Sequence, residues 1–434
     1  MPPTLHSSFR TNIAFYQEPT QGAVPGAGDT PAAQAIAWAA AEGADAFRVF
    51  VEEGDPAFIR GAMAVPNADM QENVYTKQPP HKGLPTADGG TLLSRVWGTG
   101  DSWGAGLQVL GGTPSGLGRI LAHALGGSAL GGYTDIATVA DALNFGVTTA
   151  AFAAVGHLIW IEDADDPGRL FPVQITGISG TDFTIDRELP FAPDAGDKIY
   201  GMEMAWPDAE ALTNPSDVNY STYSILYEKG PHVWLAGGSH LELTELQLER
   251  GQQPKFAWAV LSAKGVPQGD GSPDSPVWTG GVEGLGQDVK AVGHDTLLYI
   301  NDVGTTTWSC TSVFEAKLTA GVPVRSQDSV TECESGMPGR AGYMTEPADT
   351  TLEVVVPLTD DQQARWTAGT IVTVTYFQVA PVGFGYCVHI AKGFLMDAPE
   401  PVLEGTNRWR LMIQATHNDD ATTETYAAKF VLGR

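Results

Sequence analysis

The chain has little positive charge, few cysteines and no long apolar run. Its 434 residues include 24 lysines and arginines against 51 aspartates and glutamates, which gives a formal net charge of −27. Proteins grip nucleic acid by neutralising phosphates with lysine and arginine, so this balance argues against a nucleic-acid binder. Hydrophobic residues make up 43% of the chain, which is enough to build a core and excludes low-hydrophobicity disorder.

The three cysteines, Cys310, Cys333 and Cys387, are too few for a disulfide framework and too far apart for a CxxC metal knuckle. We expect ordinary reduced thiols. The first residues lack the apolar run of a secretory signal, and the longest apolar stretch, residues 147–161, is short and interrupted by polar residues and glycine. These absences predict a product of the cytoplasm without a membrane span.

The strongest structural signal is a long amphipathic hairpin over residues 240–261. Leu241 and Leu243 alternate with polar residues, the alternation slips by one residue at Thr244, and it resumes at Leu246. A slip of this kind predicts a β-bulge. The turn GQQP and the run KFAWAVL follow, in which Phe256 and Trp258 alternate with alanine and complete the hairpin.

Two further blocks are rich in strands. Seven runs between residue 295 and the C-terminus predict a sandwich or barrel, and four short runs between residues 155 and 204 predict a small inserted barrel of five strands. The fold class is therefore mainly β, with sandwich and barrel domains and a few flanking helices. We place a first β-domain at 1–154 with 205–265, the inserted barrel at 155–204 and a second β-sandwich domain at 266–434.

Four segments carry helix signals. Residues 30–43 and 114–125 begin at a Thr or Ser beside proline and end before glycine, residues 134–143 form a third candidate, and Thr359 with Gln362 makes a capping box before Trp366. The run KFAWAVL is echoed by AAKFVLG at the end of the chain. If both runs complete hairpins, the β-domain is duplicated.

Catalytic and metal-binding motifs are largely missing. Ser102 in GDSWG satisfies the nucleophile-elbow pattern, but the strand and helix that an elbow needs do not flank it, so we interpret it as a loop. The acidic run from Glu162 to Asp166 fails the calcium-loop spacing and predicts a solvated turn, with an adventitious cation left open. Nine histidines show no paired spacing and are expected at the surface or at caps.

A carbohydrate enzyme is the alternative suggested by eleven tryptophans and many carboxylates, yet no pair of carboxylates stands out. Trp258, Trp308, Trp366 and Trp409 are expected in the core or at subunit contacts. We therefore expect no catalytic residue, no cofactor and no metal.

The surviving features resemble those of the major tail tube proteins of long, non-contractile phage tails. The resemblance rests on the hairpin at residues 240–261, the amphipathic helix at 114–125 and the proline-rich loop with its following strand at 397–419, DAPEPVLEGTNRWRLMIQATHND. It touches about a third of the chain by pattern. It implies a virion protein, assembled in the host cytoplasm, that forms stacked rings of six copies, or of three if the domain is duplicated.

The physics of such a tube fits these patterns. Copies complete one another's exposed strand edges by β-augmentation, and Val74, Tyr75, Phe256 and Trp258 are the candidate contacts between subunits. Glu242, Glu245 and Glu249 are the candidate lumen-lining residues, because carboxylates repel the phosphates of passing genomic DNA. The glutamates could equally face solvent on a monomer. The expected partners are further copies, other tail proteins and DNA that passes without specific binding, and no membrane.

Loops at residues 17–30 and 66–91 are long for a compact domain, and we expect them to reach the neighbouring ring. Two alternatives remain open at this point. One is another virion component, such as a capsid decoration, adaptor or receptor-binding protein, and the other is a β-rich hydrolase that uses Ser102.

Overall fold

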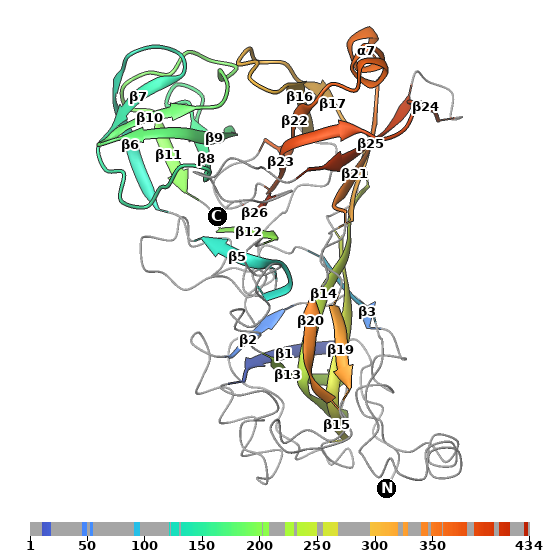
Figure 1. Ribbon diagram of the computed structural model, residues 1–434. Coiled ribbons are helices and arrows are strands. Elements are labelled where there is room, and N and C mark those ends of the chain that lie inside the picture. The colour runs from blue at the N-terminus through green and yellow to red at the C-terminus, as the bar shows by residue number, and fades with distance from the viewer. Residues whose placement is uncertain are drawn as a thin grey trace, which may run out of the picture.

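The computed structural model describes a little over half of the chain, in separate segments. The described residues are 11–18, 46–49, 53–54, 91–95, 121, 123–129, 132–201, 203–207, 222–229, 232–249, 255–267, 296–319, 324–328, 340–345, 349–357, 359–379, 386–402, 408–416 and 429–432. Over these residues the chain is mainly β, as the sequence predicts, with a closed barrel, a large branched antiparallel sheet and few helices (Figure 1).

Six antiparallel strands close into a barrel in the order β10-β7-β6-β11-β8-β9. The four predicted runs are all present, as β8 (Leu158–Glu162), β9 (Leu170–Ser179), β10 (Asp182–Ile185) and β11 (Lys198–Gly201). Two earlier strands, β6 (Tyr133–Val139) and β7 (Asn144–Val147), complete the circle. The prediction of five strands over 155–204 is therefore wrong in number and in its starting point.

The segment 134–143, a predicted helix, is strand β6 followed by a turn. Its apolar residues have helical spacing, but the β-branched Ile136, Thr138 and Val139 favour a strand. β6 pairs with β11 on one edge and with β7 on the other, so closure of the barrel decides the outcome over local periodicity. Asp141 closes the turn, since its Oδ1 accepts the backbone N–H groups of Leu143 and Asn144.

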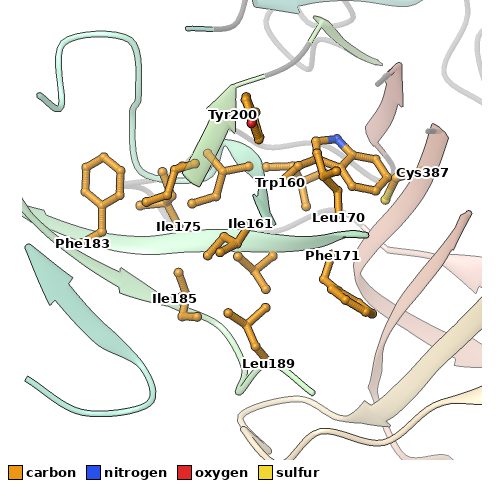
Figure 2. Close-up of a cluster of buried hydrophobic side chains, with 14 of the residues drawn as sticks. Trp160, Ile161, Leu170, Phe171, Ile175, Phe183, Ile185, Leu189, Tyr200 and Cys387 are labelled. Atoms are coloured by element: carbon orange, nitrogen blue, oxygen red, sulfur yellow. The ribbon is translucent and has the colours of Figure 1, made fainter. Parts of the chain in front are cut away.

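The barrel interior is filled by apolar side chains from every strand (Figure 2). Ile161 on β8, Val173 on β9 and Phe183 on β10 expose at most 1% of their surface. Trp160 points to the opposite face of β8 and is equally buried, next to Cys387 of the large sheet (Figure 2). The cluster continues beyond the barrel, because Phe171 packs edge-on against Trp308 and Phe377 of the large sheet, with ring centroids 5.7 and 6.4 Å apart. Barrel and sheet thus share one hydrophobic core.

Over the described residues the large sheet has eighteen strands and branches at three of them, β14, β23 and β25. Its N-terminal strands are β1 (Thr11–Gln17), β2 (Ala46–Val49), β3 (Glu53–Gly54), β4 (Thr91–Arg95) and β5 (Gly126–Ala129). The middle strands are β12 (Glu203–Pro207), β13 (Tyr223–Lys229), β14 (His232–Glu249) and β15 (Lys255–Pro267).

The C-terminal strands include at least one in each of the seven runs predicted after residue 295, two in the run that contains β17 and β18, and the additional short strand β24. They are β16 (Thr296–Asp302), β17 (Thr311–Ser312), β18 (Glu315–Thr319), β21 (Thr351–Val356), β22 (Val372–Gln378), β23 (Tyr386–Leu395), β24 (Glu400–Pro401), β25 (Trp409–Ala415) and β26 (Lys429–Leu432). A separate hairpin joins β19 (Val324–Asp328) to β20 (Arg340–Thr345).

Strands of the two β-domains that the sequence predicts pair with each other by hydrogen bonds. β14 pairs with β18, and β12 pairs with β26, so strands from both predicted domains belong to one sheet. β26 lies between β12 and β23 and is not the second arm of a hairpin with β25. The echo between the two KF-containing runs therefore does not reflect equivalent hairpins.

The helix predictions have mixed outcomes. α7 (Asp360–Ala368) begins at Thr359 with the predicted capping box and ends at Gly369, whose φ of 62° suits glycine. Residues 121 and 123–125 are helical, and β5 begins at Gly126, where the sequence predicts the end of that helix. Leu121, Ala124 and Leu125 are buried, as the predicted apolar face requires. The helix predicted at 30–43 lies outside the described residues.

Candidate functional site

Strand β14 connects two regions of the large sheet (Figure 1). One of its edges pairs with β15 along nearly the whole strand. Its other edge pairs with β13 from residue 232 to 239 and with β18 from residue 246 to 249. Because β13 continues to β1 and β2 while β18 continues to β21 and β25, the β14–β15 hairpin holds the two regions together.

The predicted bulge lies where the sequence places it. Pairing with β15 is regular up to Leu243, shifts, and resumes at Glu245, so Thr244 is the extra residue. Leu241, Leu243 and Leu246 all lie in the core, with at most 2% of their surface exposed. Without the bulge, Leu246 would turn to the opposite face. Burial of each leucine stabilises the hairpin by about 1.5–3 kcal/mol.

A ladder of alternating charges crosses the polar face of the sheet. Glu245 on β14 forms an ion pair with Lys317 on β18 at 2.7 Å, and Arg410 on β25 forms one with Glu353 on β21 at 2.6 Å. Lys317 and Glu353 are directly opposite in register, whereas Glu245 and Arg410 lie two residues away from the positions opposite them, so the four side chains follow a diagonal across four strands. The diagonal contains two acids and two bases, and Glu245 therefore adds no net charge to this face.

The structure describes less of the surroundings of the other two predicted lumen residues, Glu242 and Glu249. Glu242 is half-buried on β14 between Leu241 and Leu243. Glu249 lies at the end of β14, opposite Glu315 of β18 in register, and its side chain is outside the description. The structure thus brings Glu242, Glu245 and Glu249 onto one strand, and it gives Glu245 a basic partner that the sequence did not predict.

The predicted subunit contacts fall mostly outside the described side chains. Phe256 is opposite Leu246 of β14 and Ser94 of β4, and Trp258 is opposite Leu243 and Leu92. Both residues therefore lie on an inner strand of the sheet, although their side chains are not described. Val74, Tyr75 and Ser102 lie outside the described residues, as do both predicted inter-ring loops apart from residues 17, 18 and 91.

Two histidines meet beside β14. His123 lies in the helical segment before β5, and its ring centroid is 4.3 Å from that of His240 on β14. The Nε2 atom of His123 accepts the backbone N–H of Leu241 at 3.4 Å, and the edge of Tyr223 from β13 completes the packing at 4.8 Å. Burial lowers the pKa of His240 to about 4, and burial with the neighbouring His240 lowers that of His123.

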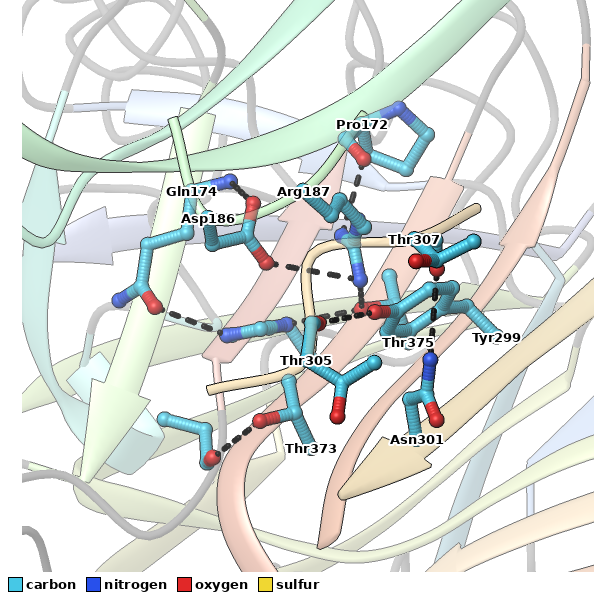
Figure 3. Close-up of polar contacts among 12 residues, drawn as sticks. Pro172, Gln174, Asp186, Arg187, Tyr299, Asn301, Thr305, Thr307, Thr373 and Thr375 are labelled. Atoms are coloured by element: carbon cyan, nitrogen blue, oxygen red, sulfur yellow. Dashed lines mark hydrogen bonds and ion pairs between the residues drawn. The ribbon is translucent and has the colours of Figure 1, made fainter. Parts of the chain in front are cut away.

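A second polar group fastens the barrel to the sheet (Figure 3). Arg187, just after β10, is fully buried and lies over the ring of Tyr299, with its guanidinium carbon 4.3 Å from the ring centroid. It donates to Thr375 Oγ1 of β22 at 2.6 Å and to the carbonyl of Pro172 at 2.9 Å. Asp186 approaches the same guanidinium at 3.6 Å. A buried cation is stable only with such partners.

The hydrogen bonds at this joint continue from Thr375 through His389 to Gln174. Thr375 Oγ1 accepts from Arg187 and lies 2.9 Å from Nδ1 of His389. Because an amide oxygen only accepts, Nε2 of His389 donates to Gln174 Oε1 at 3.3 Å. Gln174 returns to the barrel by donating to the carbonyl of Gly156. The chain of bonds connects β9 to β23 through His389.

Residues 163–166 of the acidic run lie in a turn, as predicted, whereas Glu162 is the buried last residue of β8 and not part of a solvated turn. Glu162 accepts the backbone N–H of Gly168 and the hydroxyl of Tyr200, both at 2.7 Å. Asp166 forms an exposed ion pair with Arg169 at 3.3 Å. Within the part of the chain that the structure describes, no three or more His, Cys, Asp or Glu side chains are grouped to hold a metal ion.

The residues that make these contacts were not predicted from the sequence. His240 and His389, expected at the surface or at caps, expose at most 1% of their surface. Arg187 lies in the predicted strand run FTIDREL. The adjacent charges of Asp186 and Arg187 at the end of this apolar strand are the sequence feature that could have indicated a buried polar contact. Lys317 alternates with buried Ala316 and Leu318, a pattern that places it on the polar face.

No protein-family model matches the chain, and no curated protein matches it. Among the described residues, no helix is long and apolar enough to cross a membrane. The case for a function therefore depends on the residues and their arrangement.

Proposed function

We propose that this chain is a structural protein of a phage or phage-like tail that assembles into stacked rings and forms a hollow conduit for DNA. The observation that carries the proposal is the β14–β15 hairpin, whose 18-residue first strand joins two regions of an open sheet. A hairpin of that length with one apolar and one polar face suits strand-to-strand contacts between identical copies.

The charge of the chain supports the same proposal. A net charge of −27 disfavours adhesion of DNA to the walls of a conduit, since carboxylates repel phosphates. Lys317 compensates Glu245, so Glu245 contributes less to this repulsion than the sequence suggested. Glu242 and Glu249 stay candidates for the lumen, and the expected localisation is the virion tail after assembly in the host cytoplasm.

The inserted barrel has a separate place in this proposal. Its strands pair only with one another, so it offers no strand to a sheet shared between copies. It is fastened to β16 and β22 by Arg187. We place it on the outside of the ring, where a compact addition does not interrupt the sheet.

Negative-stain microscopy of the purified full-length protein tests the proposal. We expect hollow fibres or rings of uniform width. Tyr75→Glu is expected to abolish fibres with the far-ultraviolet circular dichroism retained, whereas Arg169→Ala, which changes an exposed residue of the barrel, leaves them intact. A monodisperse small particle at every concentration would instead favour a capsid decoration, adaptor or receptor-binding protein.

The hydrolase alternative has its own measurement. Turnover of ester or polysaccharide substrates that is lost in Ser102→Ala would replace the structural proposal with an enzymatic one.

A further inference from the structure

The point at which β14 changes neighbours has an unusual backbone arrangement. On the edge away from β15, ladder pairing with β13 ends at Ser239 and pairing with β18 begins at Leu246. A strand edge between two partners leaves backbone N–H and C=O groups that need other acceptors and donors. In this interval the N–H of Leu241 donates to Nε2 of His123 at 3.4 Å. An imidazole thus takes the place of a strand partner.

This hydrogen bond requires a specific protonation state. Nε2 can accept the Leu241 N–H only while it carries no proton, because a protonated imidazole has donors at both nitrogens. Protonation of His123 would place two N–H groups against each other. The contact is therefore compatible only with a neutral His123, independently of its surroundings.

The second histidine adds a further constraint on charge. His240 lies against His123 with ring centroids 4.3 Å apart, and its Nδ1 faces the carbonyl of Leu241 at 3.1 Å. Since a carbonyl only accepts, Nδ1 carries the proton of the neutral ring. Adding a charge to either imidazole at this separation penalises a charge on the other.

Among the described residues, the ring of Tyr223 from β13 and the backbone of Leu241 contact the pair, and no carboxylate contributes to the lowered pKa of either imidazole. Glu18 belongs to the same region, but it accepts hydrogen bonds from the hydroxyls of Thr222 and Ser224. Glu242 is the residue after Leu241 on β14. The lowered pKa of each imidazole comes from burial, and for His123 also from His240, rather than from these carboxylates.

We propose that His123 and His240 form a proton-operated latch, which holds the helical residues 121 and 123–125 on β14 at neutral pH and releases them in acid. The helical residues run directly into β5, which pairs with β12. Release therefore frees the middle of the β14–β15 hairpin and loosens the connection to β5. The latch is a property of the single chain and stands whether or not the chain forms rings.

Hydrogen–deuterium exchange on the unassembled full-length protein tests the latch. Between about pH 7 and pH 4.5, after correction for the intrinsic rate, protection of the Leu241 amide is expected to fall about tenfold or more. In His123→Gln, a side-chain carbonyl oxygen can accept the same N–H without titrating, and the fall is expected to become clearly smaller, with only the contribution of His240 left. His157→Gln is the matched control, because His157 Nδ1 also accepts a backbone N–H, from Ala154 at 3.2 Å within the barrel. This variant should retain the fall at Leu241.

A second measurement covers the case in which His123→Gln does not fold. In the unsubstituted protein, the imidazole nitrogen signals of His123 are expected to titrate below the ordinary pKa of 6.5 and together with the loss of Leu241 protection. Protection that does not change with pH in the unsubstituted protein overturns the latch. So does an equal fall in His123→Gln, or a His123 that titrates at its ordinary pKa without any change at Leu241.

Discussion

The barrel and the β14–β15 hairpin solve the problem of exposed strand edges in different ways. In the barrel every strand has two neighbours, and apolar side chains such as Ile161 and Phe183 fill the interior completely. The hairpin belongs to a sheet that branches and remains open, and its β14 strand changes partners along one edge. A closed barrel is complete within one chain, whereas an open sheet can be extended by another.

The two regions also use buried polar groups differently. At the barrel joint, Arg187 is held by a carboxylate, a hydroxyl and a carbonyl, so its charge is matched within the chain. Beside the hairpin, His123 and His240 are buried in their neutral forms. We therefore expect mild acid to destabilise the hairpin region and not the joint.

The largest expected effect is the loss of Arg187. Arg187→Ala leaves Asp186 buried without its cation and removes the stacking on Tyr299, and we expect a loss of about 3–5 kcal/mol in the free energy of unfolding. Denaturant titration measures this, and the barrel is expected to unfold in a separate transition. Arg169→Ala, which removes an exposed ion pair of the same barrel, should change stability by less than about 1 kcal/mol. Equal effects of the two variants would contradict the role of the joint.

A cavity in the barrel core should have the next largest effect. Ile161→Ala removes a fully buried side chain, and we expect a cost of about 2–5 kcal/mol. Because the barrel is closed within one chain, the cost should be the same in assembled and unassembled protein. Calorimetry of both forms gives the comparison, and a cost that assembly largely rescues would show that the barrel is completed by a neighbour.

Acid should change the stability of the two regions in opposite directions. Because the folded pKa of His240, about 4, lies below the ordinary 6.5, the unfolded chain binds more protons between these values. Stability is then lost as the pH falls from about 6.5 to about 4, by roughly 3 kcal/mol for His240. Burial raises the pKa of Asp186 in the barrel joint, and this effect has the opposite sign in its own window above pH 3.8. Urea titrations across this pH range in the unsubstituted protein and in His240→Phe measure the difference, which should shrink in the variant.

The smallest expected effect concerns the charge ladder. Lys317→Ala removes the partner of Glu245 on a partly exposed face, and we expect a loss of about 0.5–1 kcal/mol that decreases as salt is added. Glu245→Ala in the Lys317→Ala background should cost less than Glu245→Ala alone. Additive losses in this double-mutant cycle would show that the pair does not stabilise the sheet.

The sequence predicts well those features that depend on local patterns. The bulge at Thr244 follows from a one-residue slip between leucines, and the cap of α7 follows from Thr359 and Gln362. The start of the barrel was missed, because Ile136 and Val139 have helical spacing and only their pairing with β7 and β11 selects a strand. The joint at Arg187 and Thr375 was missed for a similar reason, since these residues are 188 positions apart in the chain.

Hydrogen–deuterium exchange of assembled against unassembled protein tests the central claim most directly. We predict that assembly increases the protection of amides in the β14–β15 hairpin, above all in the part of β15 beyond Ala259 that β4 does not pair with, while the barrel amides of β8 and β9 stay unchanged. A hairpin whose protection is the same in both forms, or a gain of protection confined to the barrel, would contradict the account.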